Sequence, residues 1–172
     1  IIVANHNSHL DTMAIMSMIP YGLIGITHPV AASDYFGKNK WQFYFSKNII
    51  NAILIKRKKD DPGQNPIELM SKFIDKGHGL IIFPEGSRGE PQVLQPFKKG
   101  TTRILEEAHK KGINPIIHIA GIAYNQFRGI GKKVNISIID LLLTRPIITP
   151  KDRVEFNKNA YHILNNNIFP PT

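Results

Sequence analysis

The chain has 172 residues, of which 42% are hydrophobic and 20% are charged, a composition typical of one folded domain rather than of a disordered segment. It contains no cysteine, which excludes disulfides, thiolate metal sites and a cysteine nucleophile, and which fits a reducing compartment. Its net charge of +9 favours anionic partners, such as phosphorylated substrates, lipid headgroups or nucleic acid.

The chain opens on the apolar run "IIVA", which predicts a strand at residues 1–4. Because the first residue is Ile1 and not Met, we expect a domain over residues 1–172 that lacks its N-terminal residues, with any upstream membrane anchor left open. The apolar stretch at residues 13–26 is shorter than the roughly 18 residues that span a bilayer, and proline and glycine interrupt it. It fits a core helix better than an element that dips into a membrane interface.

The remaining elements follow from apolar periodicity and capping signals. A helix over residues 9–19 is predicted to begin at Ser8, which stands at the capping-box spacing from Asp11. Further helices are expected at 33–40, 65–77, 98–111 and 149–166, and further strands at 28–32, 52–55, 79–83, 115–124 and 134–142. This alternation predicts a single α/β domain with a mostly parallel central sheet flanked by helices.

Two polar loops, "NHNSHLD" at 5–11 and "PEGSRG" at 84–89, each follow an apolar strand. In parallel sheets, ligands collect beyond the carboxyl ends of the strands. We therefore expect the two loops to build one site.

The first loop offers a base. The carboxylate of Asp11 can reach one imidazole nitrogen of His6, fix its tautomer and leave the other nitrogen free to accept a proton. Alternatively, Asp11 only caps the helix and complements its dipole. A metal site formed by these two residues with His9 is a weaker alternative, because zinc requires at least three protein ligands in the right geometry.

The second loop offers an anion pocket. Gly86 permits backbone torsions that turn amides toward a ligand, and Arg88 carries a planar guanidinium suited to phosphate. Glu85 is costly to bury alone and is expected to pair with Arg88 or with a substrate hydroxyl. The alternative is a tight turn held by a structural Glu–Arg pair. Ser87 lacks the Gly-x-Ser-x-Gly pattern of a nucleophile, as does Ser8.

Together these segments resemble the glycerolipid acyltransferase family of the PlsC type, over roughly residues 1–125. Its His-x4-Asp motif matches "HNSHLD", and its Phe-Pro-Glu-Gly-Thr-Arg motif matches "FPEGSR". Its second motif, an apolar strand that closes on arginine, matches "AILIKR", and its fourth matches "NPIIHIAGI" more loosely. Two positions depart from the family pattern, Asn51 in place of a glycine and His118 in place of a proline.

The resemblance implies transfer of a fatty acyl group from acyl-CoA or acyl-carrier protein to a hydroxyl of a phosphorylated glycerolipid, with 1-acylglycerol 3-phosphate as the expected acceptor. His6 would be the general base and Asp11 its partner. The acceptor site would be formed by Arg57, Glu85, Gly86, Ser87 and Arg88. No metal and no cofactor beyond the thioester co-substrate would be needed.

The same resemblance implies work at the cytoplasmic face of a membrane, with the protein peripheral or anchored through residues outside this chain. Two other functions stay open: a non-catalytic module that binds anionic lipid, and a hydrolase that uses water as acceptor. A nucleic-acid partner is not expected, because the basic residues are dispersed and no recognised binding motif accompanies them.

Overall fold

The computed structural model describes residues 1–8, 10–32, 50–55, 65–89, 93–124, 134–141 and 146–168. Its elements are, in chain order, β1 (Ile2–Ala4), α1 (Asp11–Met18), α2 (Tyr21–Ile24), β2 (Thr27–Ala32), β3 (Ile53–Ile55), α4 (Pro66–Asp75), β4 (Gly79–Ile82), α5 (Gly100–Lys110), β5 (Ile117–Tyr124), β6 (Val134–Leu141) and α6 (Pro150–Ile168). The helix expected at 33–40 lies outside the described residues, and the short α2 was not expected.

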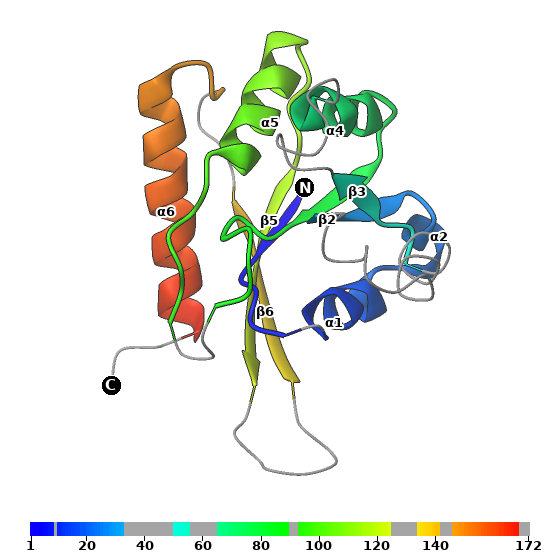
Figure 1. Ribbon diagram of the computed structural model, residues 1–172, viewed down its shortest axis with the longest axis vertical. Helices are drawn as coiled ribbons and strands as arrows, with labels where there is room; N and C mark the ends of the chain where they lie inside the picture. Colours follow the sequence, from blue (N-terminus) through cyan, green and yellow to red (C-terminus); the bar gives the residue numbers. More distant parts are fainter. Residues whose placement is uncertain are drawn as a thin grey trace.

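The six strands form one sheet in the order β3-β2-β4-β1-β5-β6 (Figure 1). Every neighbouring pair is parallel except β5 and β6, which are antiparallel. The prediction of an α/β domain with a mostly parallel central sheet is confirmed. The two polar loops follow β1 and β4, two central strands that are neighbours in this sheet.

Helices cover both faces of the sheet because successive strand residues point to opposite sides. Val3 packs with α5 and α6 on one face, whereas Ala4 packs under α1 on the other. Three buried clusters make up the core: one beneath α5 and α6 (Val3, Leu105, Ile117, Ile119, Phe156, Leu164), one beneath α4 and α5 (Ile53, Met70, Ile74, Leu80, Ile82, Ile104), and one beneath α1 (Ala4, Ile15, Met16, Ile81, Ala120, Ile122). These layers hold the ends of β1, β4 and β5 in fixed positions.

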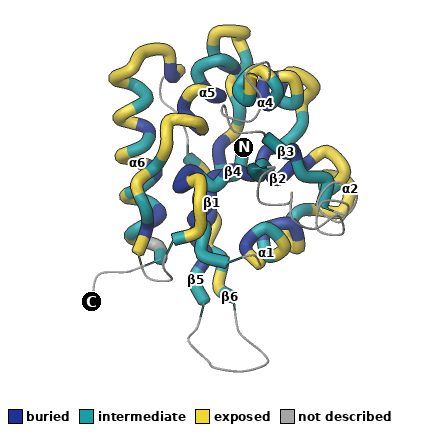
Figure 2. The backbone as a smooth tube through the Cα atoms, in the orientation of Figure 1, coloured by how far each residue is buried: buried dark blue, intermediate teal, exposed yellow. Residues whose placement is uncertain are grey.

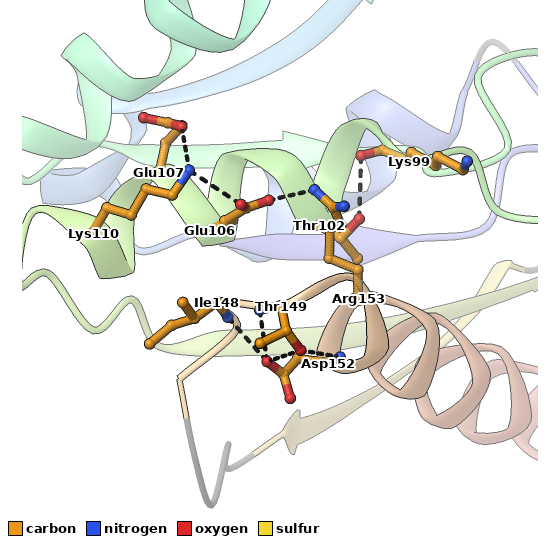
Figure 3. Close-up of polar contacts among 9 residues, drawn as sticks. All are labelled: Lys99, Thr102, Glu106, Glu107, Lys110, Ile148, Thr149, Asp152 and Arg153. Carbon is orange, nitrogen blue, oxygen red and sulfur yellow. Dashed lines mark hydrogen bonds and ion pairs between the residues drawn. The ribbon is translucent and has the colours of Figure 1, made fainter.

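Polar contacts join α6 to α5 at the edge of this core (Figure 3). The Arg153 guanidinium on α6 lies 2.5 Å from the Glu106 carboxylate on α5, and Lys110 also contacts Glu106 at 3.1 Å. At the start of α6, Thr149 and Asp152 form a reciprocal capping box: the Asp152 carboxylate accepts the Thr149 N–H at 2.7 Å, and the Thr149 hydroxyl accepts the Asp152 N–H at 3.2 Å.

The predicted capping box at the start of α1 forms only in part. The Asp11 carboxylate does accept the Ser8 N–H at 2.7 Å, but the Ser8 hydroxyl accepts the N–H of Leu10 instead of that of Asp11. Leu10 is the N-cap residue, without a side-chain cap, and the helix begins at Asp11. The prediction of Ser8 as N-cap is therefore wrong, because its loop is shaped by other contacts of the Asp11 carboxylate.

Candidate active site

The carboxyl ends of β4, β1 and β5 meet at one edge of the sheet. In register, Val3 stands beside Ile82 on one side and beside Ile119 on the other, with all three strands parallel. The loops after β1 and β4 are joined by two hydrogen bonds: the His6 N–H donates to Glu85 Oε1 at 2.7 Å, and the Gly89 N–H donates to the His6 carbonyl at 3.0 Å. The structure thus places the two polar loops side by side, as the sequence led us to expect.

Asn5 fixes the first of these loops to the sheet. Its buried side chain donates to the Ile122 carbonyl at 2.9 Å and accepts the Ile122 N–H at 2.7 Å, so that it continues the pairing of β1 with β5 past the end of β1. Sequence reasoning missed this role, although an asparagine directly after a buried strand was visible. Because Asn5 precedes His6, this clamp sets the backbone from which the imidazole projects.

His6 and Asp11 form a hydrogen-bonded pair. His6 Nδ1 lies 3.0 Å from Asp11 Oδ2, and the same oxygen accepts the N–H groups of Asn7 and Ser8, each at 2.7 Å. Asp11 is fully buried, whereas the His6 side chain stays 21% exposed. The carboxylate therefore folds the loop around itself and leaves the imidazole within reach of solvent.

Electrostatics fix the direction of the His6–Asp11 hydrogen bond. Burial by itself raises the pKa of the Asp11 carboxyl, but hydrogen bonds from His6, Tyr124 and two backbone amides outweigh it and hold the pKa below its usual range. Asp11 is thus ionised at neutral pH and can only accept. His6 Nδ1 must then carry the proton, which leaves Nε2 of the neutral ring as the nitrogen that can accept one.

The ring plane of His6 is held by Phe83, which follows β4. The two rings stack with their centroids 4.2 Å apart and their planes 22° apart. Stacking of this kind favours one ring orientation. Together with the bond to Asp11, it gives the imidazole a defined position at the edge of the sheet.

Glu85 joins the second loop to the first. It is 2% exposed, and its second oxygen accepts the Gln95 N–H at 2.9 Å while its first accepts the His6 N–H. Burial raises the pKa of Glu85, and the two amide hydrogen bonds only partly offset this, so the pKa lies above its usual value. Both oxygens are thus engaged by backbone amides, so this carboxylate shapes the site by holding the main chain of His6 in place.

The rest of the second loop is exposed. Gly86, Ser87 and Arg88 all face solvent, and Gly86 has a φ of +69°, a conformation that favours glycine. A Cβ at Gly86 would lie 2.8 Å from Nζ of Lys98, so that this ammonium group lies directly over the loop. Sequence reasoning missed Lys98, although it stands in the basic pair of "FKKG". Arg88 and Lys98 give this edge a positive character suited to an anion.

Some predicted site residues cannot be placed. Arg57 lies outside the described residues, and so does His9, on which the metal-site alternative depended. Within the described part of the chain, no group of three or more histidine, aspartate or glutamate side chains could hold a metal ion.

Tyr124, the last residue of β5, also belongs to the site. Its hydroxyl donates to Asp11 Oδ1, the carboxylate oxygen that does not face His6. No signal in the sequence pointed to it, because 113 residues separate it from Asp11. Parallel pairing of β5 with β1 brings the two together.

Comparisons with known proteins show the family and the fold of the chain. A family model described as acyltransferase matches residues 1–124. A probable 1-acyl-sn-glycerol-3-phosphate acyltransferase of Mycoplasma pneumoniae is 28% identical over 112 residues, which are 63% of this chain and 40% of that protein. A 1-acyl-sn-glycerol-3-phosphate acyltransferase of Cocos nucifera is 34% identical over 106 residues, 60% of this chain and 32% of that protein.

A solved structure has a similar fold. The crystal structure of the 1-acyl-sn-glycerophosphate acyltransferase PlsC from Thermotoga maritima superposes with a TM-score of 0.63 and 16% sequence identity, over 96% of this chain and 63% of that one. This likeness concerns the fold. The chain spans less than half the length of the curated relatives described above.

Proposed function

Because this chain belongs to the acyltransferase family, we propose that the protein transfers a fatty acyl group from an acyl thioester to a hydroxyl of a phosphorylated glycerolipid. The names of the relatives favour 1-acyl-sn-glycerol 3-phosphate as the acceptor. The observation that carries the proposal is the His6–Asp11 pair, which stands beside the exposed, positively charged loop after β4. A base next to an anion site suits an acceptor that carries both a hydroxyl and a phosphate.

In the proposed reaction, His6 Nε2 removes the proton of the acceptor hydroxyl as its oxygen attacks the thioester carbonyl carbon. Asp11 holds His6 in the required tautomer and stabilises the imidazolium. The tetrahedral intermediate collapses, the C–S bond breaks, and the thiolate takes the proton back from His6. The products are an ester and a free thiol, and the imidazole is regenerated.

We assign the phosphate of the acceptor to the loop after β4. Arg88 offers a planar fork for the phosphate oxygens, and Gly86 and Ser87 are exposed on the same loop. Lys98 adds a second positive charge over Gly86. Arg57 stays a further candidate from the sequence, and Glu85 contributes by positioning the backbone of His6.

We also propose that the protein works at a membrane surface, as its lipid acceptor requires. The support is an uncharged apolar face on α1 and α2, next to the catalytic pair. Residues 12–26 contain no charged side chain, and several of their large apolar residues are exposed, namely Met13, Met18, Tyr21, Leu23 and Ile26 (Figure 2). Among the described residues, no helix has the length and apolarity to cross a bilayer. The cytoplasmic face stays a prediction.

The test is a thiol-release assay on the full-length protein with acyl-CoA or acyl-carrier protein and a panel of lysophospholipids and glycerol 3-phosphate. We expect thiol release that depends on a phosphorylated acceptor and falls by about 10²-fold or more in His6→Ala, the usual share of general-base catalysis. Release of free fatty acid without an acylated lipid would indicate a hydrolase. Vesicle binding that survives His6→Ala, with no thiol release by the intact protein, would indicate a lipid-binding module.

A further inference from the structure

We propose that Tyr124 is a positioning residue of the His6–Asp11 pair, whose hydroxyl holds the Asp11 carboxylate in the orientation that keeps His6 an effective base. The inference rests on the proposed function and extends it to a residue outside both polar loops. Tyr124 ends β5, whereas His6 lies in the loop after β1 and Asp11 begins α1. The role therefore depends on sheet pairing and not on the local motif.

The argument begins with the two oxygens of the carboxylate. Oδ2 accepts from three groups: the His6 ring and the amides of Asn7 and Ser8. Oδ1 accepts from the Tyr124 hydroxyl. Asp11 is fully buried, so its Oδ1 is out of contact with water. Without the Tyr124 hydroxyl, no hydrogen bond from that group would offset the free-energy cost of burying this oxygen. The carboxylate could then lower its energy by rotating about its Cβ–Cγ bond, which would disturb the bond to His6.

The proton stays on Tyr124. Burial raises the pKa of the Tyr124 hydroxyl, and the hydrogen bond to Asp11 and the charge of that residue raise it further, while Ser8 opposes the shift. Tyr124 therefore remains a phenol and a hydrogen-bond donor at neutral pH. It is not a proton carrier in the reaction, and it acts on His6 through Asp11.

Loss of the hydroxyl has a definite electrostatic sign. The bond from Tyr124 lowers the pKa of Asp11, so its removal raises that pKa. A carboxylate with greater proton affinity interacts more strongly with the imidazolium that forms during the reaction, so we expect the pH dependence of turnover to change. Glu85 also interacts electrostatically with both members of the pair, and it is unchanged in the variants below.

The experiment compares Tyr124→Phe with Tyr161→Phe in the full-length protein. Tyr161 on α6 donates its hydroxyl to the Leu94 carbonyl at 3.2 Å, so its variant removes one tyrosine hydroxyl that is bonded to a backbone carbonyl and not to Asp11. For Tyr124→Phe we expect kcat to fall about tenfold, the cost of one buried hydrogen bond, with KM for both substrates unchanged. The acidic limb of the kcat–pH profile should move to higher pH. Tyr161→Phe should leave kcat and the profile unchanged.

A second measurement does not depend on turnover. Carbon-13 NMR of the aspartate carboxyls should show a higher pKa for Asp11 in Tyr124→Phe than in the wild type or in Tyr161→Phe. An active wild type with an unshifted Asp11 pKa and an unshifted pH profile in Tyr124→Phe would overturn the inference and leave the proposed function intact. A wild type without acyl transfer to any acceptor would overturn the proposed function, and the inference with it.

Discussion

At the scale of single residues, Asp11 has both a structural and a chemical role. Its carboxylate accepts hydrogen bonds from His6, Asn7, Ser8 and Tyr124, and it is fully buried. The sequence left open whether Asp11 only caps the helix or supports a base. In the structure Asp11 stands in the first turn of α1, and its carboxylate bonds both the preceding loop and the His6 ring. Any substitution of Asp11 should affect stability as well as turnover.

We expect Asp11→Asn to lower the free energy of unfolding by about 2 kcal/mol at neutral pH, because a buried charged acceptor is replaced by an amide. The pKa of Asp11 in the folded protein lies below the ordinary value of 3.8, so its stabilisation is complete above 3.8 and is lost as pH falls through the folded-state pKa. Urea denaturation of both proteins across this range should show the difference shrinking on acidification. A difference that stays constant with pH would contradict this account.

The residues of the site differ in how far the sequence could reveal them. His6 and Asp11 stand five positions apart, so their contact could be predicted from local spacing. Asn5 reaches Ile122 and Tyr124 reaches Asp11 across more than 110 positions of sequence, and only the parallel pairing of β1 with β5 joins them. The hydrogen bonds from backbone amides to both Glu85 oxygens could not be predicted either, because every residue type except proline carries the same backbone donor.

At the scale of elements, two similar sequence signals had different outcomes. Ser8 and Asp11 stand at the same spacing as Thr149 and Asp152, yet the full reciprocal capping box forms only at the start of α6. At α1 the carboxylate is shared with His6 and Tyr124, and the helix starts at Asp11 itself. At the start of α4, the Asn65 side chain caps the helix by accepting the Ile67 N–H at 3.1 Å.

The contact of α6 with α5 gives a prediction at this scale. Arg153 and Glu106 are partly buried, with side chains 27% and 14% exposed, so their ion pair should be stronger than one in full contact with solvent. A double-mutant cycle of Glu106→Ala and Arg153→Ala, measured by urea denaturation, should give a coupling energy of about 1 kcal/mol.

The matched control is the pair of Glu68 and Lys72 within α4, whose side chains are 62% and 64% exposed. The same cycle there should give at most about 0.5 kcal/mol, as is usual for exposed pairs on a helix. Equal coupling energies in the two cycles would show that partial burial adds nothing to the contact of α5 with α6.

At the scale of the whole molecule, the order of the strands explains the position of the site. The strands that precede the two polar loops, β1 and β4, are neighbours in the middle of the sheet, and β5 lies on the other side of β1. The alternation of strands and helices could be read from the sequence because each apolar run is short and ends in polar residues or glycine. Strand order could not, since it depends on which strands bury the most surface together.

The sheet also separates α1 and α2 from α6, which lies on the opposite side of the molecule (Figure 1). If the uncharged face of α1 and α2 rests on lipid, amide hydrogen exchange of residues 10–26 in the full-length protein should slow when vesicles containing phosphatidylglycerol are added. Exchange in α6 should not change. Leu23→Glu should reduce the protection of α1 and α2 by about tenfold or more, because it places a charge where an apolar side chain would be buried.

The control for this change is Val154→Glu on α6, where an apolar side chain is 70% exposed on an element far from the proposed contact. In that variant we expect residues 10–26 to stay fully protected on vesicles, because the added charge lies outside the face that we propose contacts lipid. Protection that is equal in Leu23→Glu and in the wild type would show that lipid does not contact α2. Protection lost to the same degree in both variants would mean that the effect of charge is general, and that α1 and α2 form no specific membrane face.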